Sequence, residues 1–201
     1  DYTFDAKYGF RDYRGGGRSS ARTTAAIVAG GVIAKQILSQ MFDIEIIAYT
    51  KSVLNITADI NPLTVTKQKV DSNAVRCPDE NKASKMEKLI LDVKSQGNSV
   101  GGIIECVIKN LPAGIGEPVF DKLDALLAKA MLSINAVKGF EIGDGFEATR
   151  KLGNENNDIF LPDETTLTNH AGGVLGGISN GMPVVFRTAF KPTPSILVPQ
   201  K

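Results

Sequence analysis

The sequence predicts an α+β fold in which helices pack on or between mainly antiparallel sheets. Helical patterns and Ile/Val-rich strand patterns both occur, but they do not alternate regularly as parallel βαβ units would. Hydrophobic residues make up 42% of the 201 residues and charged residues 22%, which indicates a folded rather than a disordered chain. This length suits one domain, or two small lobes that share a core.

The N-terminal part predicts one long helix after a glycine-rich turn. Residues 1–14 are aromatic and charged, and three glycines follow at 15–17. A helix is expected over residues 19–40 because a long apolar run begins there. Ser19 or Ser20 is expected to cap it, since a serine hydroxyl can accept the free N–H groups of the first turn.

The middle of this helix, residues 25–34, is apolar on every side, which is typical of a helix that is buried all round. Gly30 and Gly31 cost the helix about 1 kcal/mol each relative to alanine, and a close backbone neighbour would offset that cost. Arg22 and Lys35 bound the apolar run. Because a bilayer span needs about 20 apolar residues, no transmembrane helix is expected.

Further strands are expected where Ile and Val gather, and loops where Gly, Pro and polar residues cluster. The expected strands are residues 43–50, 52–58, 100–111, 137–142 and 183–190. The expected loops are residues 61–77, 112–117, 143–145, 154–168 and 169–181.

Two further helices are expected from apolar residues that recur at helical spacing. The first starts at Pro78-Asp79 and ends near Gln96, with Gly97 as its stop. The second begins with Pro118 in its first turn and carries an apolar stripe from Phe120 to Leu132.

Composition excludes several classes of protein. Lys and Arg total 23 and Asp and Glu 22, giving a net charge of +1, which argues against a strongly basic nucleic-acid-binding surface. The chain opens without a basic segment or an apolar core, so no signal peptide is expected. Cys77 and Cys106 are too few for a disulfide framework and are expected to be reduced, as in a cytoplasmic protein.

Four arginines suggest an anion site near the start of the long helix. Arg11, Arg14, Arg18 and Arg22 lie within twelve positions, and the last two share a helix face. The glycine-rich turn would place free N–H groups beside these guanidiniums, which suits a phosphate or a carboxylate. The alternative is a solvated arginine cluster. Neither a G-x-x-x-x-G-K-[ST] loop nor a strand followed by G-x-G-x-x-G is present.

Catalytic and metal-binding patterns are sparse. His170 is the single histidine, which excludes a His-His metal site and disfavours a Ser-His-Asp triad. It lies in a predicted tight turn and is read as structural. Cys77 precedes a helix start and could have a lowered thiol pKa, although both cysteines are read as structural. No metal site is expected, and the carboxylates near glycine turns are read as caps and turn formers.

Five blocks of the sequence resemble the chorismate synthase family. They fall in the family's order, and the resemblance covers the chain from end to end, being weakest over residues 49–98. Their total length makes coincidence implausible. The blocks are RDYRGGGRSSARTTAAIVAGGVIAK (11–35), LPAGIGEPVF (111–120), DKLDALLAKAMLSINAVKGFEIGDGF (121–146), TNHAGGVLGGISNG (168–181) and FKPTPSI (190–196).

The resemblance implies a fold and a reaction. The fold would be a β-α-β sandwich of the chorismate synthase type, with residues 1–201 as the central part of a single domain. The enzyme would convert 5-enolpyruvylshikimate 3-phosphate into chorismate and phosphate by 1,4-anti-elimination, the last common step of the shikimate pathway. The reaction needs reduced FMN although there is no net redox change. The resemblance also implies a cytoplasmic homotetramer, and it leaves open the NADP-dependent flavin reduction found in some members.

Carried over by position, the resemblance assigns flavin contacts to four segments, where glycines let backbone amides approach the cofactor. The arginines beside the first segment are expected to bind the substrate's phosphate or carboxylate groups. The cofactor-binding residues so implied are Arg18, Ser19, Ser20, Asn135, Ala136, Gly176, Lys191, Pro192, Thr193, Pro194 and Ser195, and the substrate-binding residues are Arg11, Arg14 and Arg22.

The family's acid–base groups are expected outside this sequence. One catalytic histidine belongs to a GESHG-type opening block that is absent, and a second would fall just before Asp1. The R-x-D-P block, with the catalytic aspartate, would follow Lys201. His170 matches neither histidine, so no catalytic residue is expected within this chain, and the 201 residues alone are expected to be inactive.

Two other interpretations remain open at this point: a non-catalytic flavin- or anion-binding remnant, and a structural α+β module. They differ in geometry. A flavin site predicts that Arg18, Asn135, Gly176 and Lys191 share one cleft, whereas a structural module predicts that they are scattered.

Overall fold

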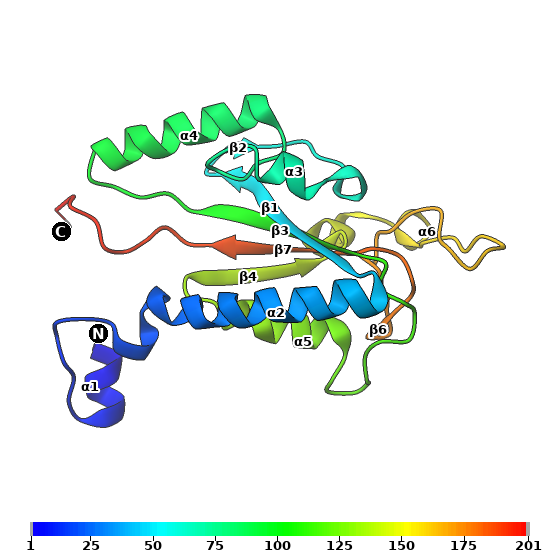
Figure 1. Ribbon diagram of the computed structural model, residues 1–201, viewed down its shortest axis with the longest axis horizontal. Coiled ribbons are helices and arrows are strands. Elements are labelled where there is room, and N and C mark those ends of the chain that lie inside the picture. Colours follow the sequence, from blue (N-terminus) through cyan, green and yellow to red (C-terminus); the bar gives the residue numbers. More distant parts are fainter. Residues whose placement is uncertain (1, 200–201) are drawn as a thin grey trace.

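A five-stranded antiparallel sheet forms the centre of the computed structural model, which describes residues 2–199 (Figure 1). The strand order is β2-β1-β3-β7-β4, and every neighbouring pair is antiparallel. A two-stranded hairpin of β5 and β6 lies apart from it. The strands are β1 (Glu45–Val53), β2 (Ile56–Thr57), β3 (Gly102–Lys109), β4 (Val137–Ile142), β5 (Val174–Leu175), β6 (Ile178–Ser179) and β7 (Val184–Phe190).

Helices lie on both faces of the sheet, with α4 on one side of it and α2 and α5 on the other in Figure 1. Short helical turns connect these elements. The helices are α1 (Tyr2–Tyr8), α2 (Thr24–Phe42), α3 (Lys67–Val70), α4 (Glu80–Ser95), α5 (Leu123–Leu132) and α6 (Gly153–Asn156), and the 3-10 turns are η1 (Gly17–Ser19), η2 (Ala21–Thr23), η3 (Pro62–Thr64) and η4 (Gly145–Arg150).

Successive side chains along a strand point to opposite faces of the sheet, so the buried residues form a separate core cluster on each face. Cys106 and Phe186 point to the face where α5 packs, whereas their neighbours Val107 and Val185 point to the face of α3. A third cluster joins α4 to the sheet through Met86, which is fully buried. The mainly antiparallel α+β prediction is therefore confirmed.

Several sequence-based boundaries agree with the structure. The strand predicted at 137–142 coincides with β4, and those at 100–111 and 183–190 contain β3 and β7. The helix predicted from Pro78-Asp79 to about Gln96 corresponds to α4, which spans Glu80–Ser95. Asp79 caps it by accepting a hydrogen bond from the backbone N–H of Lys82 at 3.0 Å.

The prediction of two strands at 43–50 and 52–58 places the boundary between them wrongly, since β1 extends to Val53 and β2 covers only Ile56–Thr57. One strand, β1, continues through Lys51, and its register with β3 shifts between Thr50 and Ser52. The chain instead turns after Val53, where Leu54 adopts a positive φ of 50°. This register shift lies inside one continuous strand, and the sequence around it resembles the end of a strand.

The prediction that Pro118 opens the third helix is also wrong, since α5 begins at Leu123. Glu117 and Asp121 exchange two backbone hydrogen bonds of 2.9 and 3.0 Å, which close a tight turn in place of a first helical turn. Phe120 therefore does not join the apolar stripe and is 88% exposed.

Helix α2 begins later than predicted and is not buried. Two short turns, η1 and η2, precede it, and Ser20 caps η2 by accepting from the N–H of Arg22 at 3.4 Å. None of its 19 residues is buried, and, apart from the adjacent residues and the helix's own backbone, no atom of the described residues lies within 4 Å of a Cβ built at Gly30 or Gly31. The burial prediction is therefore wrong for this chain.

Residues Ala21–Phe42 are long and apolar enough to cross a bilayer by length and composition, with a mean hydropathy of 1.4. The core helices of soluble proteins pass the same test, so this finding is weak support for a span. It nevertheless leaves the expectation of no transmembrane helix unconfirmed.

Candidate functional site

Three of the four predicted flavin segments meet at one end of the sheet. The Asn135 side-chain amide donates to the carbonyl oxygen of Ser19 at 2.7 Å, across 116 positions of sequence. The backbone N–H of Lys191 donates to the carbonyl oxygen of Ala136 at 3.0 Å. The turn before α2, the α5–β4 turn and the end of β7 are therefore joined directly.

Local geometry explains why the α5–β4 turn reaches both neighbours. Ala136 adopts a positive φ of 69°, in the left-handed region that non-glycine residues seldom occupy. The N–H of Val137 donates to the carbonyl oxygen of Ile134 at 3.2 Å, which closes the turn. The Asn135 side chain and the Ala136 carbonyl thus emerge next to each other at the start of β4.

The tail after β7 is held against the linker between α4 and β3. Ser99 Oγ donates to the carbonyl oxygen of Thr193 at 2.6 Å, and the N–H of Leu197 donates to the carbonyl oxygen of Gly97 at 2.8 Å. A Cβ on Gly101 would lie 2.5 Å from the carbonyl oxygen of Phe190, so this approach requires glycine. Residues 191–195 are exposed along this path.

The four arginines differ in what they contact. Arg11 pairs with Asp5 at 3.2 Å, and Arg14 makes a forked pair with Asp12 at 2.9 and 2.7 Å. The hydrogen bonds from Arg14 hold the pKa of Asp12 below its usual value. Among residues 2–199, no ion pair involves Arg18 or Arg22, and both are exposed beside the Asn135–Ser19 contact. These two are the arginines available to an anion.

Gly176, the fourth predicted flavin segment, lies at the other end of the sheet. Its hairpin is tied to the start of α5 by a 2.8 Å hydrogen bond from the N–H of Leu123 to the carbonyl oxygen of Gly177. Asn135 follows the opposite end of α5. The seven residues of β7 span roughly 20 Å, so the described residues do not bring Gly176 beside Lys191.

Sequence reasoning missed Ser179, which is 3% exposed and organises the loop between β3 and α5. Its hydroxyl donates to the carbonyl oxygen of Pro112 at 2.6 Å and accepts from the N–H of Ile115 at 2.9 Å. The backbone N–H of Gly114 donates to the Ser179 carbonyl at 2.9 Å. The glycine-rich hairpin and the PAGIGE loop are therefore one unit.

His170 contacts two charged groups that its sequence neighbours did not reveal. Its Nδ1 lies 2.8 Å from Asp144 Oδ2 and 3.0 Å from Lys151 Nζ, and Lys151 also pairs with Asp144. Together they join the turn after β4 to the glycine-rich segment, in agreement with a structural role for His170.

Both cysteines are buried free thiols. Burial raises the pKa of the Cys106 thiol to about 12. Burial also raises the pKa of Cys77, so the suggestion of a lowered pKa at this helix start is wrong. Within residues 2–199, no group of three or more His, Cys, Asp or Glu side chains could hold a metal ion.

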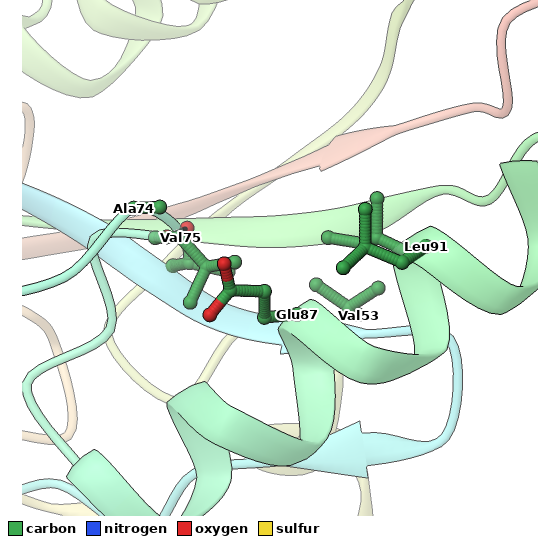
Figure 2. Close-up of a pocket in the computed structure, with 7 residues that line it drawn as sticks. Val53, Ala74, Val75, Glu87 and Leu91 are labelled. Carbon is green, nitrogen blue, oxygen red and sulfur yellow. Dashed lines mark hydrogen bonds between the residues drawn. The ribbon is translucent and has the colours of Figure 1, made fainter.

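Two cavities in the described part of the chain lie away from the three joined segments. One, of 330 Å³, lies between α4 and β1, and Figure 2 shows Glu87 and Leu91 beside Val53 and Val75 there. A second, of 290 Å³, is more polar and includes Asp59. The joined segments instead form an open surface at the end of the sheet.

Comparison with known proteins identifies the family. The family model described as chorismate synthase matches residues 1–201, the whole chain. The chain belongs to the chorismate synthase family. It is 54% identical over 200 residues to a chorismate synthase of Gloeothece citriformis and 54% identical over 205 residues to one of Synechocystis.

The chain spans about half the length of these curated relatives. The two alignments cover 98% and 100% of this chain but 55% and 57% of the chorismate synthases. A crystal structure of chorismate synthase superposes with a TM-score of 0.80 at 34% identity, covering 96% of this chain and 62% of that one. The predicted fold of the chorismate synthase type is therefore confirmed.

Proposed function

We propose that the protein carrying this chain converts 5-enolpyruvylshikimate 3-phosphate into chorismate and phosphate, using reduced FMN. Membership of the chorismate synthase family supports the reaction. The observation that carries the proposal is the joining of Ser19, Asn135, Ala136 and Lys191 by two hydrogen bonds. These residues come from three blocks that resemble the family's flavin contacts.

The residues at this end of the sheet fit FMN. The cofactor carries a phosphate and a flat, largely apolar ring. Arg18 offers an exposed guanidinium without an ion pair among the described residues, and Lys191 offers an exposed ammonium. Pro192 and Pro194 offer apolar surface on a tail whose path is fixed by Ser99. When bound, reduced FMN supplies electron density transiently to the elimination.

Arg22 is the best-placed substrate contact in this proposal. It lies four residues after Arg18, and both guanidiniums are exposed. A substrate with phosphate and carboxylate groups needs several such donors. Arg11 and Arg14 would have to exchange their pairs with Asp5 and Asp12 to contribute.

The remaining features of the proposal come from the family resemblance. The chain would be the central part of a single domain, in a cytoplasmic homotetramer. No acid–base residue is proposed within it, and the 201 residues alone would not turn over substrate. Gly176 lies at the other end of the sheet, so in this proposal it would contact FMN only if the cofactor extends to that end.

The test begins with the intact natural protein under anaerobic conditions. With reduced FMN it should release phosphate from 5-enolpyruvylshikimate 3-phosphate and form chorismate in equal amounts. Flavin binding without turnover would identify a non-catalytic remnant, and absence of both would contradict the proposal.

Arg18→Ala tests the flavin site. Loss of one charge-assisted contact to a phosphate should raise the Kd for FMN by about 10–100-fold, measured by flavin fluorescence. Arg150→Ala is the matched control, because Arg150 is exposed and, among residues 2–199, forms an ion pair only with the nearby Glu147. Equal affinities for the two variants would place the flavin elsewhere.

A further inference from the structure

A row of polar side chains crosses the sheet in register. Tyr49 of β1 is opposite Glu105 of β3, Glu105 is opposite Arg187 of β7, and Arg187 is opposite Glu141 of β4. Tyr49 belongs to the core cluster on the α3 face, so the row lies on that face. Glu105 is only 2% exposed, and opposite charges in neighbouring positions are favourable.

The row holds the Arg187 guanidinium from both sides. Its Nε lies 3.2 Å from Glu141 Oε2, and its Nη1 lies 3.5 Å from Glu105 Oε2. Glu105 also accepts a hydrogen bond from Tyr49 and lies 3.4 Å from Lys51 Nζ. Burial, followed by the contact with Glu105, raises the pKa of Tyr49, which keeps it a donor. The guanidinium plane is thereby fixed.

The third nitrogen of the Arg187 guanidinium, Nη2, donates to a backbone carbonyl. The acceptor is the carbonyl oxygen of Gly143 at 2.6 Å, the shortest of the three contacts. A lysine could not reproduce this, because a guanidinium presents its donors in a rigid fork and an ammonium does not.

Gly143 is the point where the glycine-rich segment crosses the end of β4. A Cβ on Gly143 would lie 2.0 Å from the carbonyl oxygen of His170 and 2.6 Å from the N–H nitrogen of Gly172. The N–H of Gly143 donates to the Val185 carbonyl at 2.9 Å, and that of Asp144 donates to the His170 carbonyl at 2.8 Å. A shift of Gly143 would therefore shift the segment 169–181.

We propose that Arg187 is a positioning residue: through the Gly143 carbonyl it fixes the glycine-rich segment 169–181, and hence the backbone at Gly176. The consequence for flavin rests on the proposed function. The consequence for the backbone does not, because it follows from the contacts among Arg187, Gly143 and Gly172. Arg187 touches no reacting group in this proposal.

Arg187→Lys in the intact protein tests the proposal. The variant keeps a positive charge between Glu105 and Glu141 but loses the donor to Gly143. Hydrogen exchange of the amides of residues 171–177 should become about tenfold faster, while exchange in β1 and β3 is unchanged. If Gly176 contacts FMN, as the family resemblance implies, the Kd for FMN should rise by a similar factor; faster exchange with an unchanged Kd would place Gly176 outside the flavin site and support the role of Arg187 in fixing the segment. Arg150→Lys is the control and should change neither quantity.

Two results would overturn the proposal. One is an exchange rate over residues 171–177 equal to that of the wild type, and the other is faster exchange across the whole sheet, which would make Arg187 a general stabilising residue.

If Arg187→Lys does not fold, Glu141→Gln provides a second test, because it weakens the contact on one side of the guanidinium. It should accelerate the same amides less than Arg187→Lys does, and unchanged exchange would count against the proposal. Wild-type protein that does not bind FMN would contradict the proposed function, and the exchange data would still decide the role of Arg187.

Discussion

The Asp158 carboxylate fixes the backbone at the start of the glycine-rich segment 169–181. Its Oδ1 accepts from Thr168 Oγ1 and from the N–H of His170, both at 2.7 Å, and its Oδ2 accepts from the N–H of Ala171 at 2.9 Å. Partial burial acts to raise the pKa of Asp158, but these hydrogen bonds outweigh it and lower the pKa below its usual value.

Asp158→Asn should destabilise the protein by about 1–3 kcal/mol near pH 7, because the new amide group places a donor against a backbone N–H. The lowered folded-state pKa means that the stabilisation is present above the unfolded pKa of about 3.9 and is lost as the pH falls through the folded value. The difference between wild type and variant should therefore shrink below about pH 4, as measured by denaturant unfolding.

Asp163→Asn is the control for this measurement, since in the described part of the chain the Asp163 side chain accepts hydrogen bonds only from the nearby Thr165, in an exposed turn. A loss as large as that of Asp158→Asn would show that the effect is not specific to the glycine-rich segment. A difference between wild type and Asp158→Asn that persists unchanged at pH 3 would show that the loss does not depend on the charge of Asp158.

Individual residues of the site could be predicted only in part. The motif blocks pointed to Ser19, Asn135 and Lys191, and the structure joins their segments. The contacts of Arg187 could not be predicted, because its carboxylate partners lie 46 and 82 positions away. The signal available was a charged residue, Glu105, at an inward position of an apolar strand.

At the scale of elements, α4 shows how a local signal fixes a boundary. Asp79→Ala should remove the cap and destabilise the protein by about 1 kcal/mol, which lowers Tm by about 2–4 °C for a domain of this size. Thermal unfolding followed by circular dichroism measures this shift. The reason is the loss of the Asp79 acceptor for the N–H of Lys82.

Asp92→Ala provides the comparison on the same helix, because Asp92 is exposed and away from the first turn. Its Tm should stay within about 1–2 °C of wild type. Equal shifts for the two variants would mean that Asp79 acts through its charge or helix propensity and not as a cap.

The start of α5 shows where element prediction failed. The N–H of Leu123 has no partner within α5 because it lies at the helix start, and it donates instead to the carbonyl oxygen of Gly177. That partner is 54 positions away, so no local pattern could place the boundary there. The proline at 118 resembled a helix start, but the backbone exchange between Glu117 and Asp121 decided the conformation.

At the scale of the whole molecule, the irregular order of elements correctly indicated an antiparallel α+β fold. The strand order β2-β1-β3-β7-β4 could not be predicted, because β7 inserts between β3 and β4 from the end of the chain. The exposure of α2 could not be predicted either. Its apolar residues indicated burial all round, whereas only Thr24 and Leu38 are even half-buried.

The exposed surface of α2 predicts that the 201-residue chain associates with itself in solution. Ile27, Val28 and Ile33 are each more than 60% exposed, and contiguous apolar surface of this kind promotes association. Ile33→Lys should reduce binding of a hydrophobic dye and shift the light-scattering mass towards 21.5 kDa.

Gln36→Lys adds the same charge on the same helix without removing apolar surface, and it should leave the mass distribution unchanged. A wild-type chain that is monomeric at micromolar concentration would contradict this prediction. So would equal effects of the two substitutions.

The hydrogen bonds that join Ser19 to Asn135 and Ala136 to Lys191 also set an order in time. Ser19 leaves the ribosome about 170 residues before Lys191, which takes roughly 10–35 s at roughly 5–20 residues per second. Throughout that interval at least one of the three joined segments has not yet been synthesised. Any ligand that needs all three segments can bind only after residue 195 has been made, so the turn that carries Arg18 is complete long before the site it belongs to.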